Sequence, residues 1–110
     1  MSFLRRGRSV ELISADFPGL RVKHLTGTTS GVQGGSDLIA HGVDEDQIVC
    51  WMASVKNNVA IRVPEGYNLG ATFEFYVSVI PGGWLEVRNA PLNSANILVK
   101  PIDILLFYTN

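Results

Sequence analysis

Charged side chains are scarce in this sequence. Lysine, arginine, aspartate and glutamate make up 17% of the 110 residues, whereas soluble domains average roughly 25%. Apolar residues account for 46%, and a domain of this length has too much surface to enclose so large an apolar share alone. The composition therefore predicts that contacts with other subunits cover part of the outer surface.

The chain also lacks an excess of charge of one sign. Its net charge is −1, so it has no basic field to attract nucleic acid or an anionic membrane, and we expect neither as a partner. Arg5, Arg6 and Arg8 form a small basic cluster, for which we favour a solvated N-terminal segment over an anionic partner.

Long apolar runs are missing as well. None reaches the length of a membrane-spanning helix, so we expect no membrane insertion. The first residues lack the apolar segment of a signal peptide. A protein of this kind would be made in the cytoplasm and, if it acts outside a cell, would leave by another route, such as assembly into a particle.

Cysteine occurs once, at Cys50, which excludes an internal disulfide and a disulfide-stapled secreted fold. The thiol lies in an apolar run, residues 48–52. This setting predicts a buried, unreactive side chain rather than a nucleophile.

Helical periodicity is almost absent, and turn-forming residues interrupt the chain at short intervals. β-Branched and aromatic residues fill the intervening segments, as in half-buried strands. The predicted strands are residues 20–26, 37–40, 47–55, 60–63, 71–80, 84–89 and 102–108. This spacing predicts an all-β fold, a small antiparallel β-sandwich of about six to eight strands.

We expect one sandwich domain over residues 20–110, preceded by an N-terminal arm or leading strand over residues 1–19. Within that first part, residues 9–17 suit either an extended arm or a single helical turn. The clearest local prediction is a hairpin, in which Pro81-Gly82-Gly83 reverses the chain. Its inward-facing residues are Phe73, Phe75, Val77 and Val79 on one strand, and Leu85 and Val87 on the other.

Two segments are apolar on both faces. In residues 102–108 Asp103 is the exception. In residues 48–55 one face carries Ile48, Cys50 and Met52, and the other carries Val49, Trp51, Ala53 and Val55. Antiparallel sheets normally leave one face in water. A facing sheet would cover one side of these strands, and a subunit interface would cover the other.

Catalytic and metal-binding patterns find little support. His24 and His41 belong to no metal-ligand spacing with each other or with Cys50. His41 precedes the acidic residues 44–46, where it could act as a base or cation ligand; hydrogen bonding to its own loop is the favoured role. The acidic residues lack calcium-loop spacing and are expected to form a solvated turn.

No nucleotide cofactor or enzymatic activity is expected. The glycine-rich residues 27–36 lack the Gly-Lys-Ser/Thr ending of a phosphate loop, and no nucleophile elbow occurs. A paired-carboxylate glycosidase is the enzymatic alternative, since such pairs meet only in space. Glu74, Glu86 and Asp103 are its main candidates, with Glu74 and Glu86 expected near each other on the polar face of the hairpin, offset by Arg88.

Exposed aromatic rings could form a carbohydrate platform, because a ring face packs on sugar C–H groups. Tyr67, Tyr76 and Trp84 are the candidates. We select Tyr67 with its neighbour Asn68, and Trp84 beside the hairpin turn, as predicted ligand-binding residues. The alternative is that these rings cap the ends of the core.

Several segments occur in a recognisable order. They are Leu25-Thr26-Gly27-Thr28-Thr29, Gln33-Gly34-Gly35-Ser36, Ile39-Ala40-His41-Gly42-Val43, Gln47-Ile48-Val49, Phe73-Glu74-Phe75-Tyr76, Asn93-Ser94-Ala95-Asn96-Ile97-Leu98 and Lys100-Pro101, before a final strand ending in Tyr108. Over residues 20–110 this order resembles the small C-terminal β-sandwich modules at the tips of phage tail fibres and phage-derived bacterial fibres, including trimeric adhesive fibres of predatory bacteria.

The resemblance implies a homotrimeric tip on a virion or extracellular fibre, recognising a cell-surface receptor such as a glycan, without catalytic residues or cofactors. The matching positions are His41, Gly42, Asn93, Ser94 and Pro101. They would be scaffold: Gly42 in a turn, Asn93 and Ser94 bonding their own loop, Pro101 at the entry to the last strand. A purely structural virion or particle component is the alternative. The chain lacks a fibre shaft, so it is expected to be a tip fragment or a stand-alone relative.

Overall fold

A computed structural model describes residues 9–11, 19–57, 62–68 and 72–109 of the chain. These residues form eight strands and two short 3-10 helices. The elements are β1 (Ser9–Glu11), β2 (Leu20–Thr28), β3 (Ser36–Ala40), η1 (Glu45–Gln47), β4 (Ile48–Lys56), β5 (Arg62–Pro64), β6 (Phe75–Ile80), β7 (Trp84–Asn89), η2 (Ala95–Ile97) and β8 (Pro101–Thr109).

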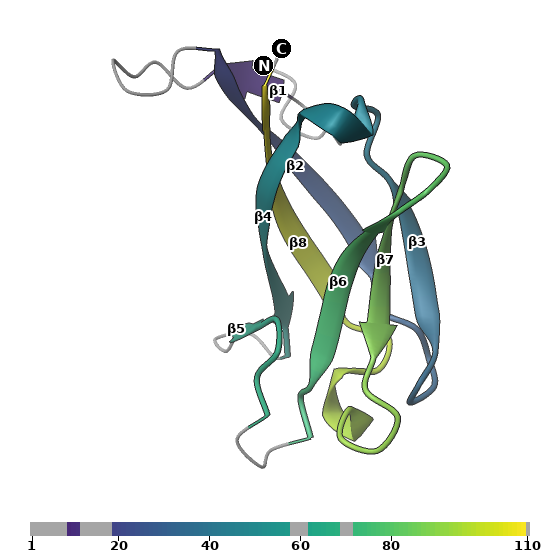
Figure 1. The fold of residues 1–110 in the computed structure, drawn as a ribbon. Helices are drawn as coiled ribbons and strands as arrows, with labels where there is room; N and C mark the ends of the chain where they lie inside the picture. The colour runs from purple at the N-terminus through teal and green to yellow at the C-terminus, as the bar shows by residue number, and fades with distance from the viewer. Residues whose placement is uncertain (1–8, 12–18, 58–61, 69–71, 110) are drawn as a thin grey trace.

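The strands form two antiparallel sheets that face each other (Figure 1). The larger sheet has the order β1-β2-β8-β4-β5, and the smaller has the order β3-β7-β6. The all-β prediction is confirmed. The last strand of the chain, β8, lies in the middle of the larger sheet between β2 and β4.

The core lies between the two sheets. Alternate residues of β8 are buried at Ile102, Ile104 and Leu106, because side chains in a strand point to opposite faces in turn. The smaller sheet contributes the inward residues of the predicted hairpin, including Phe75 and Leu85, which are fully buried. The predicted alternation of this hairpin is therefore confirmed, with β7 at the predicted bounds.

Two predictions about β4 are wrong: Ile48 and Cys50 do not share a face, and Cys50 is not buried. Ile48 pairs with Tyr108 and Cys50 pairs with Phe107, so Val49 is an extra residue without a place in the ladder. After this β-bulge, each residue of β4 lies on the face opposite to the one that strict alternation from Ile48 would give it. Ile48 therefore packs against the core, whereas Cys50 is exposed rather than buried.

Two other boundaries differ from prediction. β6 begins at Phe75 rather than near residue 71, because Thr72 has a φ of 58°, outside the range of a strand. Glu74 instead forms backbone hydrogen bonds with Asn93 and Ala90 in the loop that follows β7. Of the uncertain residues 9–17, Ser9–Glu11 is a strand paired with β2, and residues 12–17 lie outside the described part of the chain, as do residues 58–61.

The burial pattern predicts a sharp contrast between two leucines. Leu106 is fully buried in the core, whereas Leu92 is 90% exposed. Leu106→Ala should lower the free energy of unfolding by about 2–5 kcal/mol because it leaves a cavity, and Leu92→Ala should change it by less than about 0.5 kcal/mol. Denaturant unfolding at one fixed protein concentration measures both. Equal effects would contradict this assignment of the core.

Candidate functional site

The outer face of the smaller sheet gathers aromatic and charged side chains, and we refer to it as the aromatic face. Antiparallel register places its outward residues in three rows across the sheet. The rows are Ser36–Arg88–Tyr76, Leu38–Glu86–Ser78 and Ala40–Trp84–Ile80. Tyr76 is 45% exposed and Trp84 is 38% exposed, so both rings are open to a ligand.

The Tyr76 ring is held by polar contacts at its hydroxyl end. The hydroxyl donates a hydrogen bond to the Glu74 carboxylate, and Asn93 Nδ2 donates to Glu74 Oε1 over 3.0 Å. The bonds from Tyr76 and Asn93 lower the pKa of Glu74. The same bond from Tyr76 raises its own pKa above the usual 10.0, with burial and the carboxylate charge adding to the effect. The ring is thus fixed before any ligand arrives, which reduces the entropy lost on binding.

A charged pair lies between the two rings. Arg88 is directly opposite Tyr76 in the register, and its guanidinium donates to Glu86 Oε2 over 3.1 Å. The Arg88 side chain remains 54% exposed, so donors of its planar fork are open to solvent. The face therefore offers two ring surfaces with donors and acceptors between them.

Trp84 sits directly after the turn between β6 and β7. Gly82 has a φ of 102°, and a Cβ there would come within 3.3 Å of Trp84 Cδ1. Glycine thus permits both the turn and the close approach of the indole. Glu45 supports the same turn, because its Oε2 accepts a hydrogen bond from Gly83 N over 2.9 Å.

The three predicted ligand-binding residues do not come together. Gly66 N donates to Phe75 O over 2.8 Å, which places Tyr67 and Asn68 near the start of β6. Trp84 is opposite Ile80 at the end of that strand. At about 3.4 Å per residue, the two ends of β6 are roughly 17 Å apart. Tyr76, also considered from the sequence, is the aromatic residue that shares a face with Trp84.

His41 has a structural position. It is fully buried, its Nδ1 accepts a hydrogen bond from Val43 N over 3.2 Å, and its backbone carbonyl accepts one from Lys23 Nζ over 2.7 Å. Because Nδ1 is an acceptor, the proton of the neutral ring is on Nε2, 3.5 Å from Glu45 Oε2. Hydrogen bonding to its own loop agrees with the favoured sequence interpretation, and Asp44 caps the acidic turn through Asp46 N.

The other predicted scaffold positions also lie in turns and strand ends. Gly42 has a φ of 71°, a turn conformation that glycine adopts easily. Ser94 Oγ donates to Ala90 O within its own loop, whereas the Asn93 side chain binds Glu74 outside that loop. Pro101 begins β8 opposite Thr28.

The candidate carboxylates are separated. Glu86 is opposite Ser78, four positions along β6 from Glu74, or roughly 14 Å. Asp103 is on the other sheet. Glycosidase carboxyl groups lie roughly 5–10 Å apart, whereas these two backbone positions are further apart and the Glu74 carboxylate is held by Tyr76 and Asn93. Arg88 does pair with Glu86, as expected.

The outer face of the larger sheet has the opposite character, and we refer to it as the apolar face. Met52 is directly opposite Leu105, and these side chains are 63% and 40% exposed. Cys50 and Val22 lie on either side of Phe107 in the adjacent row. These five residues form a continuous apolar surface over β2, β8 and β4, as the doubly apolar pattern predicted.

A polar network borders the apolar face. Asp103 accepts hydrogen bonds of 2.8 Å from both His24 Nε2 and Arg62, and the Arg62 guanidinium also donates to Ser54 Oγ over 3.1 Å. Burial raises the pKa of Asp103, but the hydrogen bonds and charges of Arg62 and His24 outweigh it, so the net pKa is below the usual 3.8.

Within the described ranges, no three His, Cys, Asp or Glu side chains are grouped so that they could hold a metal ion. No helix in that part of the chain is long and apolar enough to cross a membrane. Comparison of the sequence and structure with protein-family models, curated proteins and solved structures gave no match.

The Asp103 network predicts a pH effect on stability. Because the pKa of Asp103 is lower in the folded state, its carboxylate stabilises the fold above the unfolded-state value, and this contribution disappears as the pH falls through the folded-state value. Asp103→Asn should therefore be less stable at neutral pH and lose less stability on acidification than the wild type. Urea unfolding across an acid pH series measures this, with Asp46→Asn in the exposed turn as the control. Parallel pH curves for Asp103→Asn and wild type would contradict it.

Proposed function

We propose that this chain is a non-enzymatic receptor-binding module that assembles into a homotrimer and recognises a cell-surface ligand, most simply a glycan. The observation that carries the proposal is the difference between the two outer faces of the sandwich. One is apolar around Met52 and Leu105, and the other presents the exposed rings of Tyr76 and Trp84.

The apolar face supports self-association. Monomeric proteins seldom leave a continuous apolar surface uncovered, and Met52, Leu105 and Cys50 are all exposed in the isolated chain. The bordering Asp103 network is paired internally. A partner can therefore cover the network without leaving an unpaired charge, which would cost several kcal/mol. A threefold arrangement follows the resemblance to trimeric fibre tips.

The aromatic face supports ligand recognition. Sugars combine apolar C–H surfaces with many hydroxyl groups, so they suit rings that flank hydrogen-bonding side chains. Tyr76 is held by Glu74, and Arg88 and Glu86 lie between Tyr76 and Trp84. With the apolar face turned toward the other subunits, the aromatic face would be directed outward on a virion or extracellular fibre.

A purely structural virion or particle component is the second candidate. The apolar face alone favours it, because packing between subunits requires no ligand. In that case the rings of Tyr76 and Trp84 would rest against neighbouring proteins of the particle. The two functions differ in whether the isolated assembly binds cells or glycans.

Charge placed in the apolar face should break the assembly. Light scattering at micromolar concentration is expected to show a trimer for the wild type. Met52→Lys and Leu105→Lys should weaken it by at least about tenfold, since an uncompensated buried charge costs several kcal/mol. Leu92→Lys is the control, because Leu92 lies in an exposed loop. A stable wild-type monomer at this concentration would sink the proposal.

Removing either ring from the aromatic face should remove ligand binding. On glycan arrays and host-cell surfaces, Trp84→Ala and Tyr76→Ala should each reduce binding at least about tenfold, as loss of an aromatic anchor typically costs about 2 kcal/mol or more. Tyr67→Ala, at the other end of β6, should bind as the wild type does. A loss of ligand binding with Tyr67→Ala alone would place the ligand-binding site at the Tyr67 end of β6 instead. A trimer without any binding would favour the structural component.

A further inference from the structure

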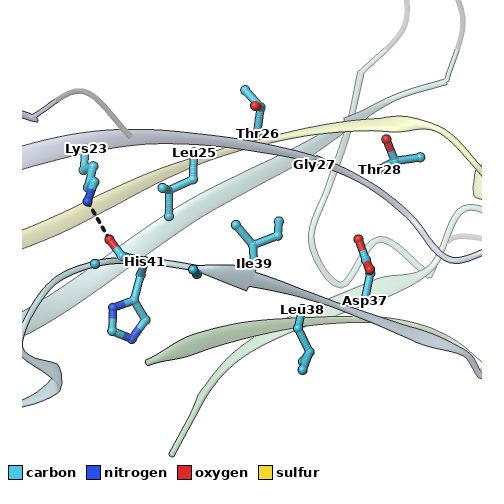
Figure 2. Close-up of a pocket in the computed structure, with 11 residues that line it drawn as sticks. Lys23, Leu25, Thr26, Gly27, Thr28, Asp37, Leu38, Ile39 and His41 are labelled. Atoms are coloured by element: carbon cyan, nitrogen blue, oxygen red, sulfur yellow. Dashed lines mark hydrogen bonds between the residues drawn. The ribbon is translucent and has the colours of Figure 1, made fainter. Parts of the chain in front are cut away.

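Strand β3 separates two different surfaces (Figure 2). On one side, a groove of about 640 Å³ lies between β2 and β3, and Ile39 points into it toward Leu25. The side chain of Leu38 points to the other side of β3, onto the aromatic face, where it is 45% exposed. Leu38 shares the middle row of that face with Glu86 and Ser78. The row between those of the two exposed rings therefore combines an apolar side chain with polar ones.

The rings of Tyr76 and Trp84 are directed to opposite ends of the aromatic face. The Tyr76 hydroxyl bonds the carboxylate of Glu74, which precedes it along the chain, and a Cβ at Gly66 would lie 3.9 Å from Tyr76 Cε1. The Trp84 indole is directed the other way, since it lies against Gly82 of the hairpin turn. The two rings are therefore no closer together than the backbone positions that carry them.

The separation of the rings exceeds the size of a single sugar. Trp84 and Arg88 are four positions apart on β7, and Arg88 is directly opposite Tyr76. At about 3.4 Å per residue, the rows of the two rings are roughly 14 Å apart. A pyranose ring is similar in size to the tyrosine ring, so one sugar unit cannot contact both rings. Two directly linked units also fall short, because their ring centres are separated by less than half of this distance. A glycan that stacks on both rings must therefore be an extended chain of at least three sugar units.

The charges of the face favour a neutral ligand. Within the three rows, the charged side chains are Glu86 and Arg88, which pair with each other. Glu74 and Glu45 add a carboxylate at each end, and both accept hydrogen bonds from the protein. The face thus carries more negative than positive charge, and an acidic chain would be repelled. Sugar hydroxyls, which both donate and accept, suit the exposed donors of Arg88 and the oxygens of Glu86 and Ser78.

We propose that the aromatic face binds a linear, uncharged oligosaccharide of at least three sugar units, with Tyr76 and Trp84 stacked on its outer units. Arg88 and Glu86 would bond the hydroxyl groups between them. This inference rests on the proposed receptor-binding function and names the class of glycan that the face would take. The two ring contacts reinforce each other, because the second forms with a ligand that the first already holds. Affinity should therefore depend on chain length rather than on one terminal sugar.

Calorimetric titration with sugars of graded length tests the proposal. The neutral probes are linear oligosaccharides of one to six units from the cello-, malto-, xylo-, manno- and N-acetylated chito- series, and the acidic probes are oligogalacturonates. In at least one neutral series, the affinity of the wild type should rise at least about tenfold from two to four units, as expected when a second aromatic anchor is engaged. Oligogalacturonates of the same lengths should bind at least about tenfold more weakly, because the face has an excess of negative charge.

Variants of one ring separate the effect of chain length from a general loss of binding. Trp84→Ala should lower the affinity for four units to about that for two, whereas Trp84→Phe, which keeps a ring, should retain most of the rise. Tyr67→Ala, away from the face, should bind as the wild type does.

The outcomes distinguish this inference from the function on which it rests. Equal affinities for one and four units, tighter binding of the acidic chains, or binding to host cells without binding to any neutral chain would overturn the inference and leave receptor binding standing. A wild type that binds neither cells nor any of these sugars would contradict the proposed function itself.

Discussion

The placement of β8 between β2 and β4 is the constraint on which the rest of the structure depends. Both neighbours pair with it along most of its nine residues, and its inward residues Ile102, Ile104 and Leu106 fill the centre of the core. The pairing of β8 with β2 joins residues that are far apart in the sequence, such as Leu20 and Thr109. Such non-local pairing slows folding in general.

This central strand also explains why the two outer faces differ. A residue pointing outward from β8 is surrounded by strands on both sides, so Leu105 and Phe107 meet Met52 and Cys50 rather than solvent-facing loops. The smaller sheet has only three strands, and its outward positions carry Tyr76, Arg88 and Trp84. Sheet position thus separates a surface suited to burial from one suited to recognition. Because Asp103 is paired with His24 and Arg62, a subunit that covered the apolar face would leave no unpaired charge beside it.

Much of this arrangement could be predicted because it depends on local alternation. The hairpin of β6 and β7 combines a period of two with a Pro-Gly-Gly turn, and those signals need no knowledge of distant residues. No local pattern marks the bulge at Val49, because the bulge exists only in the pairing of β4 with Tyr108 and Phe107 of a strand that is distant in the sequence. It placed Ile48 and Cys50 on opposite faces, whereas strict alternation predicted one shared face. The separation of Tyr67 from Trp84 likewise depends on the length of β6 and on the contact of Gly66 with Phe75.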